Sequence, residues 1–240
     1  MITITVWSDF ACPYCYIGET RLDQAVEQLG MTDKVKIDYR AFELDPTAPK
    51  EVVSSTPERF AMKYRLSLAD AEKQIEHISE LGREVGIDFR YATTRYSNTF
   101  DAHRLMKLAE AKYDYATVQR LNHLLFDAYF TRNLVLADAA VLEAVAKEAG
   151  IDEKDVKDLL AGNAYADDVR FDEREAGMRG VRGVPYMVFN GDFAVPGALT
   201  VDGMKSALER AERRVKEAEK AAAETGERPH VCGPDGCQLL

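Results

Sequence analysis

The sequence lacks the features that mark membrane-embedded, exported and nucleic-acid-binding proteins. No uncharged stretch approaches the roughly 20 apolar residues of a membrane span. The first residues do not pair a basic segment with a following apolar one, as a secretory signal peptide does. The 240 residues include 31 basic and 41 acidic side chains, a net charge of −10, which argues against nucleic acid and anionic membranes as partners. We therefore expect a cytoplasmic protein.

Cysteine is scarce, and its placement is informative. The chain has four cysteines, which form two close pairs, Cys12 with Cys15 and Cys232 with Cys237. In a reducing compartment, closely spaced cysteines are more often reactive or metal-binding than structural. The two pairs are therefore the first candidates for the chemistry of this protein.

The first pair lies at the junction of a predicted strand and a predicted helix. Residues 2–6 are β-branched and alternate in polarity, which predicts a strand, and a helix is expected at 14–29. Cysteines three positions apart on a first helical turn meet the Cα separation of roughly 4.4–6.8 Å that a disulfide needs. Pro13 suits the first helical position, and the positive end of the helix dipole favours a thiolate on Cys12. The motif predicts a redox-active dithiol in which Cys12 is the more reactive thiol.

The order of the predicted elements indicates an α/β fold. A second alternating strand over 35–44 completes a βαβ unit, whose two strands should be parallel. Near the other end, residues 184–189 and 192–195 form a predicted hairpin around Asn190-Gly191, and a helix is expected at 201–224. A βαβ half and a ββα half together predict one mixed sheet flanked by helices.

Between these two halves the chain is predicted to be helical. Capping residues indicate successive helix starts up to residue 178, and they are Thr56, Ser67, Ser97 or Asn98, Asp114, Asp138 and Asp152. The acidic residues at 167–175 are spaced as on a helix and interleaved with arginines, which predicts a solvated face. The predicted division is one domain from 1–50 and 180–224, a helical insertion over 51–179, and a tail at 225–240.

With these segments in place, the chain resembles the thioredoxin-fold disulfide oxidoreductases of the DsbA family, in particular the cytoplasmic FrnE-like branch. The resemblance rests on WSDFACPYCYIG at residues 7–18, on the helical insertion, and on GVPYMVF at 183–189. It covers nearly the whole chain and implies a thioredoxin fold with a large all-helical insertion.

The resemblance also implies roles for individual residues. Cys12 would attack the substrate disulfide, Cys15 would resolve the mixed disulfide, and Pro185 would be a cis-proline facing the dithiol. A substrate groove could include Tyr14, Val184, Asn98 and His103. The implied substrates are protein or small-thiol disulfides, with no metal or organic cofactor and with glutathione as a possible electron donor. The oligomeric state is not predicted.

Two alternatives remain open from the sequence. The same branch is similar to glutathione-dependent isomerases and kappa-class glutathione transferases, although these typically carry serine in place of Cys12. The other alternative is a zinc-holding interaction module. A tetrahedral zinc site could be formed by Cys12, Cys15, Cys232 and Cys237, and His230 is a further possible ligand. The strand-initial Pro185 favours redox chemistry, since a structural zinc site does not need it.

The tail is predicted to carry a second redox pair. Gly233-Pro234-Asp235-Gly236 suits a type I turn, which would bring Cys232 and Cys237 together. FrnE-like proteins with such a C-terminal pair resemble this design. We therefore expect the tail pair to exchange with Cys12 and Cys15.

Overall fold

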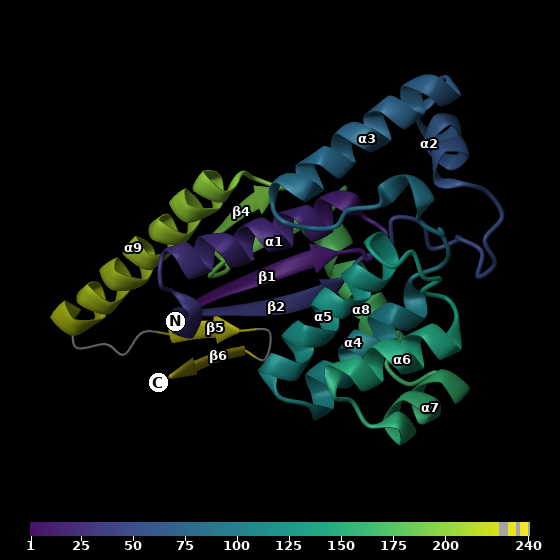
Figure 1. Ribbon diagram of the computed structural model, residues 1–240. Coiled ribbons are helices and arrows are strands. Elements are labelled where there is room, and N and C mark those ends of the chain that lie inside the picture. The colour runs from purple at the N-terminus through teal and green to yellow at the C-terminus, as the bar shows by residue number, and fades with distance from the viewer. Residues whose placement is uncertain (226–229, 234–235, 240) are drawn as a thin grey trace.

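A four-stranded mixed sheet forms the centre of the computed structural model, which describes residues 1–225, 230–233 and 236–239 (Figure 1). Strand β1 (Ile2–Ser8) pairs in parallel with β2 (Val35–Ala41), as the βαβ pattern predicts. On its other side β1 pairs antiparallel with β3 (Tyr186–Phe189), which pairs with β4 (Phe193–Pro196). The sheet order β2-β1-β3-β4 and its flanking helices confirm the predicted α/β thioredoxin fold.

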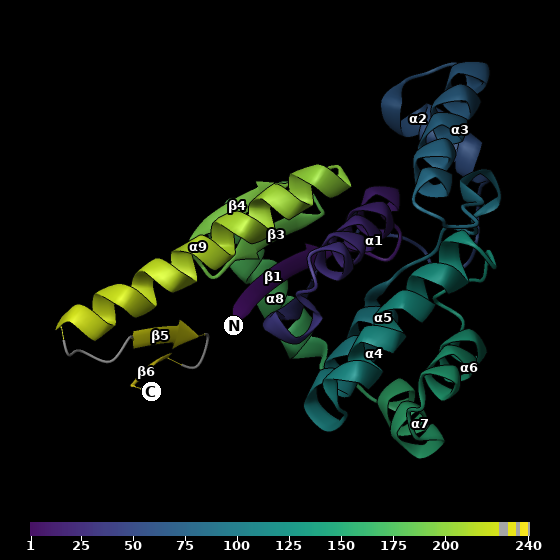
Figure 2. The same ribbon diagram turned by 60° about the vertical axis from the view of Figure 1, so that its left-hand side comes forward.

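Helices cover both faces of the sheet because β1 is apolar on both. Ile4 and Val6 point to the main core, where helices α1 (Pro13–Gln28) and α9 (Val201–Thr225) pack on each other. Trp7 points to the opposite face and packs with Ala176 of helix α8 and with Val181 and Val188. Figure 2 shows α1 and α9 on one side of the sheet and α8 on the other.

Seven helices lie between β2 and β3 in the chain. They are α2 (Thr56–Tyr64), α3 (Leu68–Glu84), α4 (Phe100–Lys112), α5 (Tyr115–Phe130), α6 (Ala139–Ala149), α7 (Glu153–Ala161) and α8 (Ala166–Met178). A short 3-10 turn, η2 (Tyr91–Thr93), lies between α3 and α4, and another, η1 (Thr32–Lys34), directly precedes β2. Asp114, Asp138 and Asp152 cap their helices as predicted. Within the described residues, no helix is long and apolar enough to cross a membrane.

Three helix boundaries differ from the prediction. Helix α4 begins at Phe100 with Thr99 as its flanking residue, not Ser97 or Asn98, and Thr99 makes no side-chain capping hydrogen bond. Ser55, not Thr56, caps α2, because its hydroxyl accepts from the Glu58 amide while the Glu58 carboxylate accepts from the Ser55 amide. The predicted sixth helix is two helices, since the chain breaks at Gly162 and Tyr165 adopts a left-handed φ of 61° before α8 begins.

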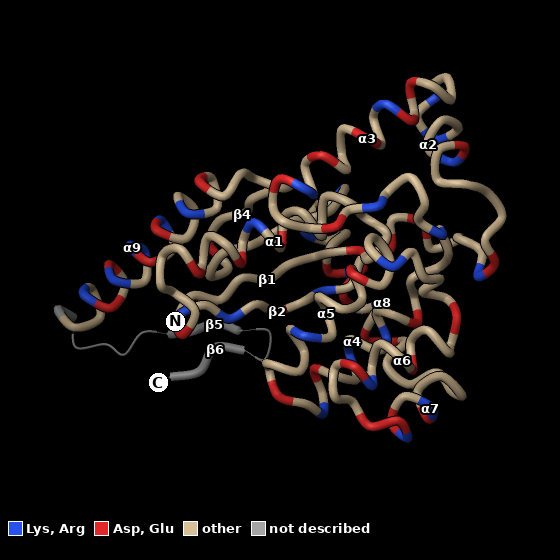
Figure 3. Tube along the Cα trace, in the orientation of Figure 1, with Lys and Arg blue, Asp and Glu red and all other residues tan. Residues whose placement is uncertain are grey.

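The acidic segment on α8 is only partly a solvated face. Asp172 is 1% exposed, which corrects the prediction for this residue. Its carboxylate accepts from the Ala41 amide at 2.9 Å and pairs with Arg40 at 3.0 Å and Lys107 at 2.7 Å. A buried carboxylate needs such partners, and here they tie α8 to β2 and α4. By contrast, acidic and basic residues alternate along the exposed length of α9 (Figure 3).

The tail forms a small two-stranded sheet of its own. Strands β5 (His230–Gly233) and β6 (Gly236–Leu239) pair antiparallel, with Cys232 directly opposite Cys237. The predicted turn at Pro234-Asp235 lies outside the described residues. In both views the hairpin lies near the start of β1, at the end of the strand remote from Cys12 (Figures 1 and 2).

A close contact inside the helical block gives a test of the packing. A Cβ on Gly82 of α3 would lie 2.5 Å from the ring of Phe89, which stacks on Phe130 with ring centroids 4.7 Å apart. We expect Gly82→Ala to lower the free energy of unfolding by about 1–3 kcal/mol, because the buried ring must move. On α8, a Cβ on Gly177 would have no atom within 4 Å, so Gly177→Ala should instead raise the free energy of unfolding by up to about 1 kcal/mol. Denaturant unfolding of both variants measures the difference, and equal effects would contradict the packing described.

Candidate active site

The dithiol motif occupies the turn between β1 and α1. Cys12 is the N-terminal flanking residue of α1, Pro13 takes the first helical position, and the Cys12 amide donates to the Asp9 carbonyl at 2.9 Å. The Asp9 carboxylate holds this turn by accepting from the Ala11 amide at 3.1 Å and the Leu44 amide at 2.7 Å. The loop before the cysteines is therefore fixed to the loop that follows β2.

The structure brings the two cysteines and the Pro185 segment together. Both cysteines are free thiols, and Cys12 keeps 4% of its surface exposed whereas Cys15 keeps none. The Cys12 thiol donates to the Val184 carbonyl at 3.5 Å, and the Val184–Pro185 peptide bond is cis. A Cβ on Gly18 would lie 3.2 Å from Pro185 Cγ, so the absence of a side chain there lets α1 approach Pro185 closely.

The environment keeps Cys15 protonated. Burial raises the pKa of the Cys15 thiol well above its usual range, and its hydrogen bond to Cys12 and the charge of Cys12 raise it further. The Ser8 hydroxyl and the Asp9 backbone partly offset this rise in the Cys15 pKa. The inner thiol therefore carries its proton at neutral pH, so a reaction that uses its sulfur as a nucleophile must remove that proton.

A buried carboxyl group lies one helical turn beyond Cys15. Glu19 accepts from the Ser8 hydroxyl at 2.6 Å and from the Asn122 amide at 2.6 Å. Burial raises the pKa of Glu19 to about 7, although these two hydrogen bonds work against the rise. Ser8 thus contacts both the inner thiol and a carboxyl that can hold a proton near neutral pH. The sequence reasoning missed Ser8, Glu19 and Asn122, although the spacing of Cys15, Glu19 and Leu22 places Glu19 on the buried face of the helix.

The other predicted groove residues divide into two groups. Val184 and Tyr14 lie at the dithiol, and Tyr14 is 42% exposed. Partial burial raises the pKa of Tyr14, and the charges of Tyr64 and Cys12 raise it further. Asn98 donates to Glu43 at 3.1 Å, and His103 is buried with its ring centroid 5.0 Å from that of Phe10. These two residues join the start of α4 to the sheet instead of lining an open surface.

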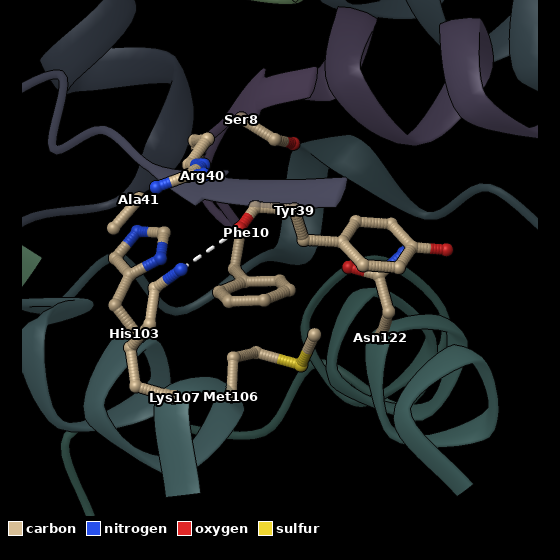
Figure 4. A pocket seen from close by; sticks show the side chains of 9 residues that line it. All are labelled: Ser8, Phe10, Tyr39, Arg40, Ala41, His103, Met106, Lys107 and Asn122. Carbon is tan, nitrogen blue, oxygen red and sulfur yellow. Dashed lines mark hydrogen bonds between the residues drawn. The ribbon is translucent and has the colours of Figure 1, made fainter. Parts of the chain in front are cut away.

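His103 faces a small cavity between the strands and helices α4 and α5 (Figure 4). Ser8 and Asn122, the two partners of Glu19, also line it, and the Lys107 ammonium donates to the Tyr39 carbonyl at 2.8 Å beside it. In the described part of the chain, no group of three or more His, Cys, Asp or Glu residues could hold a metal ion. The side chains of the tail cysteines and His230 lie outside the described residues.

Comparison with known proteins places the chain in a family. Residues 3–209 match the DSBA-like thioredoxin domain, and the chain belongs to this family. A probable DsbA oxidoreductase from Streptomyces coelicolor is 31% identical, with full coverage of both chains and a TM-score of 0.82. The uncharacterised protein YwbO of Bacillus subtilis is 22% identical over 86% of this chain and 96% of its own. The cytosolic disulfide reductase DsbM from Pseudomonas aeruginosa, solved with glutathione, is 14% identical, with 88% and 99% coverage and a TM-score of 0.61.

The buried Glu19 predicts a pH-dependent stability. Its pKa is raised in the folded state from 4.5 to about 7, so its stability contribution is full below about pH 4.5 and is lost as the pH rises through 7. This shift corresponds to about 3 kcal/mol. Glu19→Gln, which cannot ionise, should therefore unfold with a flatter pH dependence between about pH 5 and 7.5.

Denaturant unfolding of the variant and the wild type at a series of pH values measures this difference. The matched control is Glu27→Gln on the exposed face of the same helix, which should keep the wild-type dependence. A Glu19→Gln curve parallel to that of the wild type would show that this carboxyl does not titrate in the predicted range.

Proposed function

We propose that this protein is a thiol–disulfide oxidoreductase that uses Cys12 and Cys15 to exchange electrons with protein or small-thiol disulfides. The observation that carries the proposal is the difference between the two thiols. Cys12 flanks the N-terminus of α1 and retains some exposure, while Cys15 is fully buried with its pKa raised. The match to the DSBA-like thioredoxin domain and the likeness to the Streptomyces coelicolor protein support this reading.

The two thiols can act in sequence. The Cys12 thiolate attacks one sulfur of a substrate disulfide, forms a mixed disulfide and releases the other substrate sulfur as a thiolate. Cys15 then loses its proton and attacks the Cys12 sulfur, which closes the Cys12–Cys15 disulfide and releases the second substrate thiolate. Two electrons pass from the protein to the substrate, and the reverse sequence oxidises a substrate dithiol. We assign contact with the substrate backbone to Pro185 and to the Val184 carbonyl, and the hydrogen bond from the Cys12 thiol to that carbonyl supports this assignment.

We also propose that it acts in the cytoplasm with no resident metal or organic cofactor, and that glutathione can serve as its electron donor. DsbM, which shares the fold, is a cytosolic disulfide reductase solved with glutathione, and this supports the proposal. A redox titration against glutathione, followed by thiol trapping, tests whether the dithiol equilibrates with that couple.

Site-resolved alkylation tests the different reactivity of the two thiols. We expect Cys12 to be the faster-alkylated thiol at pH 7, because it flanks the helix N-terminus and keeps some exposure. Cys15, in a Cys12→Ala variant, should react at least about tenfold more slowly at pH 7, because burial, the largest cause of its raised pKa, remains in that variant. Mass spectrometry of labelled peptides separates these sites from the tail cysteines, and the chain in guanidinium is the control in which both react alike. Equal alkylation rates for the two thiols in the folded protein would contradict the assignment.

Substitution of each thiol tests the reaction itself. Cys12→Ser should abolish disulfide reduction, and Cys15→Ala should accumulate a mixed disulfide through Cys12. If Cys12→Ser instead retained activity with glutathione and an aromatic substrate, the isomerase or transferase alternative would be favoured. Stoichiometric zinc in protein purified without reductant would favour the other alternative, a zinc-holding interaction module.

The tail pair remains a proposed second redox site, and the fold limits how it can act. Helix α9 starts beside Ala198, which lies close to Gly18 of α1, and its 25 residues extend about 37 Å from there. The seven steps from Thr225 to Cys232 span at most about 25 Å. Exchange within one chain would require the end of α9 to unwind, whereas exchange between two chains would not. We therefore propose that the tail pair of one molecule serves the dithiol of another.

Mixing two variants tests this arrangement. One chain carries Cys15→Ala and serine at both tail positions, and the other carries the intact tail and Cys12→Ser. We expect a disulfide-linked heterodimer through Cys12, at a rate that rises with protein concentration. Truncation after Glu224 should slow the refolding of a scrambled disulfide substrate. If truncation left the refolding rate unchanged and no adduct could be trapped, the tail would take no part in the exchange.

A further inference from the structure

Within the described residues, the Arg59 guanidinium of α2 has no ion-pair or hydrogen-bond partner and contacts only an aromatic ring. Its guanidinium lies over the ring of Tyr96, 3.4 Å from the centroid, and its Nε atom is buried with no hydrogen-bond acceptor. Among the described residues it makes no ion pair within 4.0 Å, although the side chain as a whole is only partly buried. A buried N–H group without an acceptor is costly, so this position points to a missing acceptor.

The neighbouring carboxylates are engaged elsewhere. Asp45 accepts from the Thr47 hydroxyl at 2.7 Å, from the Thr47 amide at 3.1 Å and from the Tyr96 hydroxyl at 3.2 Å. Glu58 is used by Ser55 in the cap of α2. Arg59 acts on Asp45 only at longer range, where its charge helps to lower the pKa of that carboxyl. The guanidinium is therefore left available to a group from outside the chain.

Hydrogen bonds connect the Arg59–Tyr96 stack to the cysteine turn. The Tyr96 hydroxyl donates to the Asp45 carboxylate at 3.2 Å. Leu44, which precedes Asp45, donates its amide to the Asp9 carboxylate at 2.7 Å, and the Asp9 carbonyl accepts from the Cys12 amide at 2.9 Å. This short series of contacts is the geometric basis for placing a charged arm of a substrate at Arg59 while its disulfide meets Cys12.

We propose that Arg59, stacked on Tyr96, is a subsite for a carboxylate carried by a small disulfide substrate. This inference rests on the proposed function and names its substrate class, to which glutathione disulfide belongs. A carboxylate accepts two parallel N–H bonds from a guanidinium, which matches the free donors here. The Tyr96 ring covers one face of the guanidinium and Nε is buried, so a carboxylate on a short flexible arm fits better than one on a folded protein surface.

The reaction at this subsite is the exchange already described. Cys12 attacks the disulfide and displaces one thiolate, while the carboxylate of the other half remains on Arg59. That half stays bound as the mixed disulfide until Cys15 releases it as a thiol. Arg59 changes no bond itself, so its effect is on the binding and positioning of the charged substrate.

Two aromatic disulfides of similar size separate this role from a structural one. Dithiobis(nitrobenzoate) carries a carboxylate on each ring, and dithiodipyridine carries none; each releases a product that is followed by its absorbance. Single-turnover rates are measured for the full-length reduced protein with serine at both tail cysteines. For Arg59→Gln, the ratio of the charged-probe rate to the neutral-probe rate should fall about tenfold, the effect of losing a charge-assisted hydrogen bond. Arg59→Lys should give an intermediate ratio, because it keeps the charge without the planar pair of donors.

The control is Lys63→Gln, which removes an exposed charge from the same helix and should leave the ratio within about twofold of the wild type. Glutathione disulfide and its ethyl ester repeat the comparison with a peptide substrate. An unchanged ratio in Arg59→Gln, or an equal fall in Lys63→Gln, would overturn the subsite. Wild-type protein that reacts with neither probe, or reacts equally well as Cys12→Ser, would instead refute the proposed function.

Discussion

The site depends on strand β1 having partners on both edges and cover on both faces. Its parallel neighbour β2 ends at the same edge of the sheet, and its antiparallel neighbour β3 begins there. Three segments that are remote in sequence therefore meet where β1 stops: the cysteine turn, the loop at Leu44 and the Val184–Pro185 segment. The hydrogen bonds from Asp9 to Leu44 and from Cys12 to Val184 are local consequences of that topology.

Two buried carboxyl groups near the dithiol illustrate how neighbours decide a charge state. Burial alone would raise the pKa of both. For Asp9, the proximity of His103 and the backbone amides of Leu44 and Ala11 outweigh burial, and the pKa is lowered. Glu19 has only two neutral donors, Ser8 and Asn122, which do not outweigh burial, and its pKa is raised. One carboxylate is thus a fixed charge that shapes the turn, while the other can take up and release a proton beside the inner thiol.

The sequence predicted those parts of the fold that local patterns determine. The alternation at 2–6 and 35–44 defined the parallel pair, and the capping aspartates located the starts of three helices. The approach of Val184 to Cys12 depends on pairing across more than 170 residues, and it was expected only through the family resemblance. The roles of Asp172, Glu19 and Arg59 depend on partners supplied by other elements, such as Arg40 and Lys107 for Asp172. Residue type and periodicity cannot distinguish a paired buried charge from a solvated one.

The proposed exchange reaction and the proposed carboxylate subsite depend on different parts of the chain. The sulfurs, the Val184 carbonyl and Pro185 are held by the sheet and α1, where the main-chain geometry leaves little freedom. Helix α2 is held apart from these strand ends, since its packing partners are α3 and η2. A substitution on α2 is therefore expected to leave the strand ends that hold the two thiols undisturbed. Because Arg59 belongs to this helix, the subsite proposed there could change with little effect on the dithiol itself.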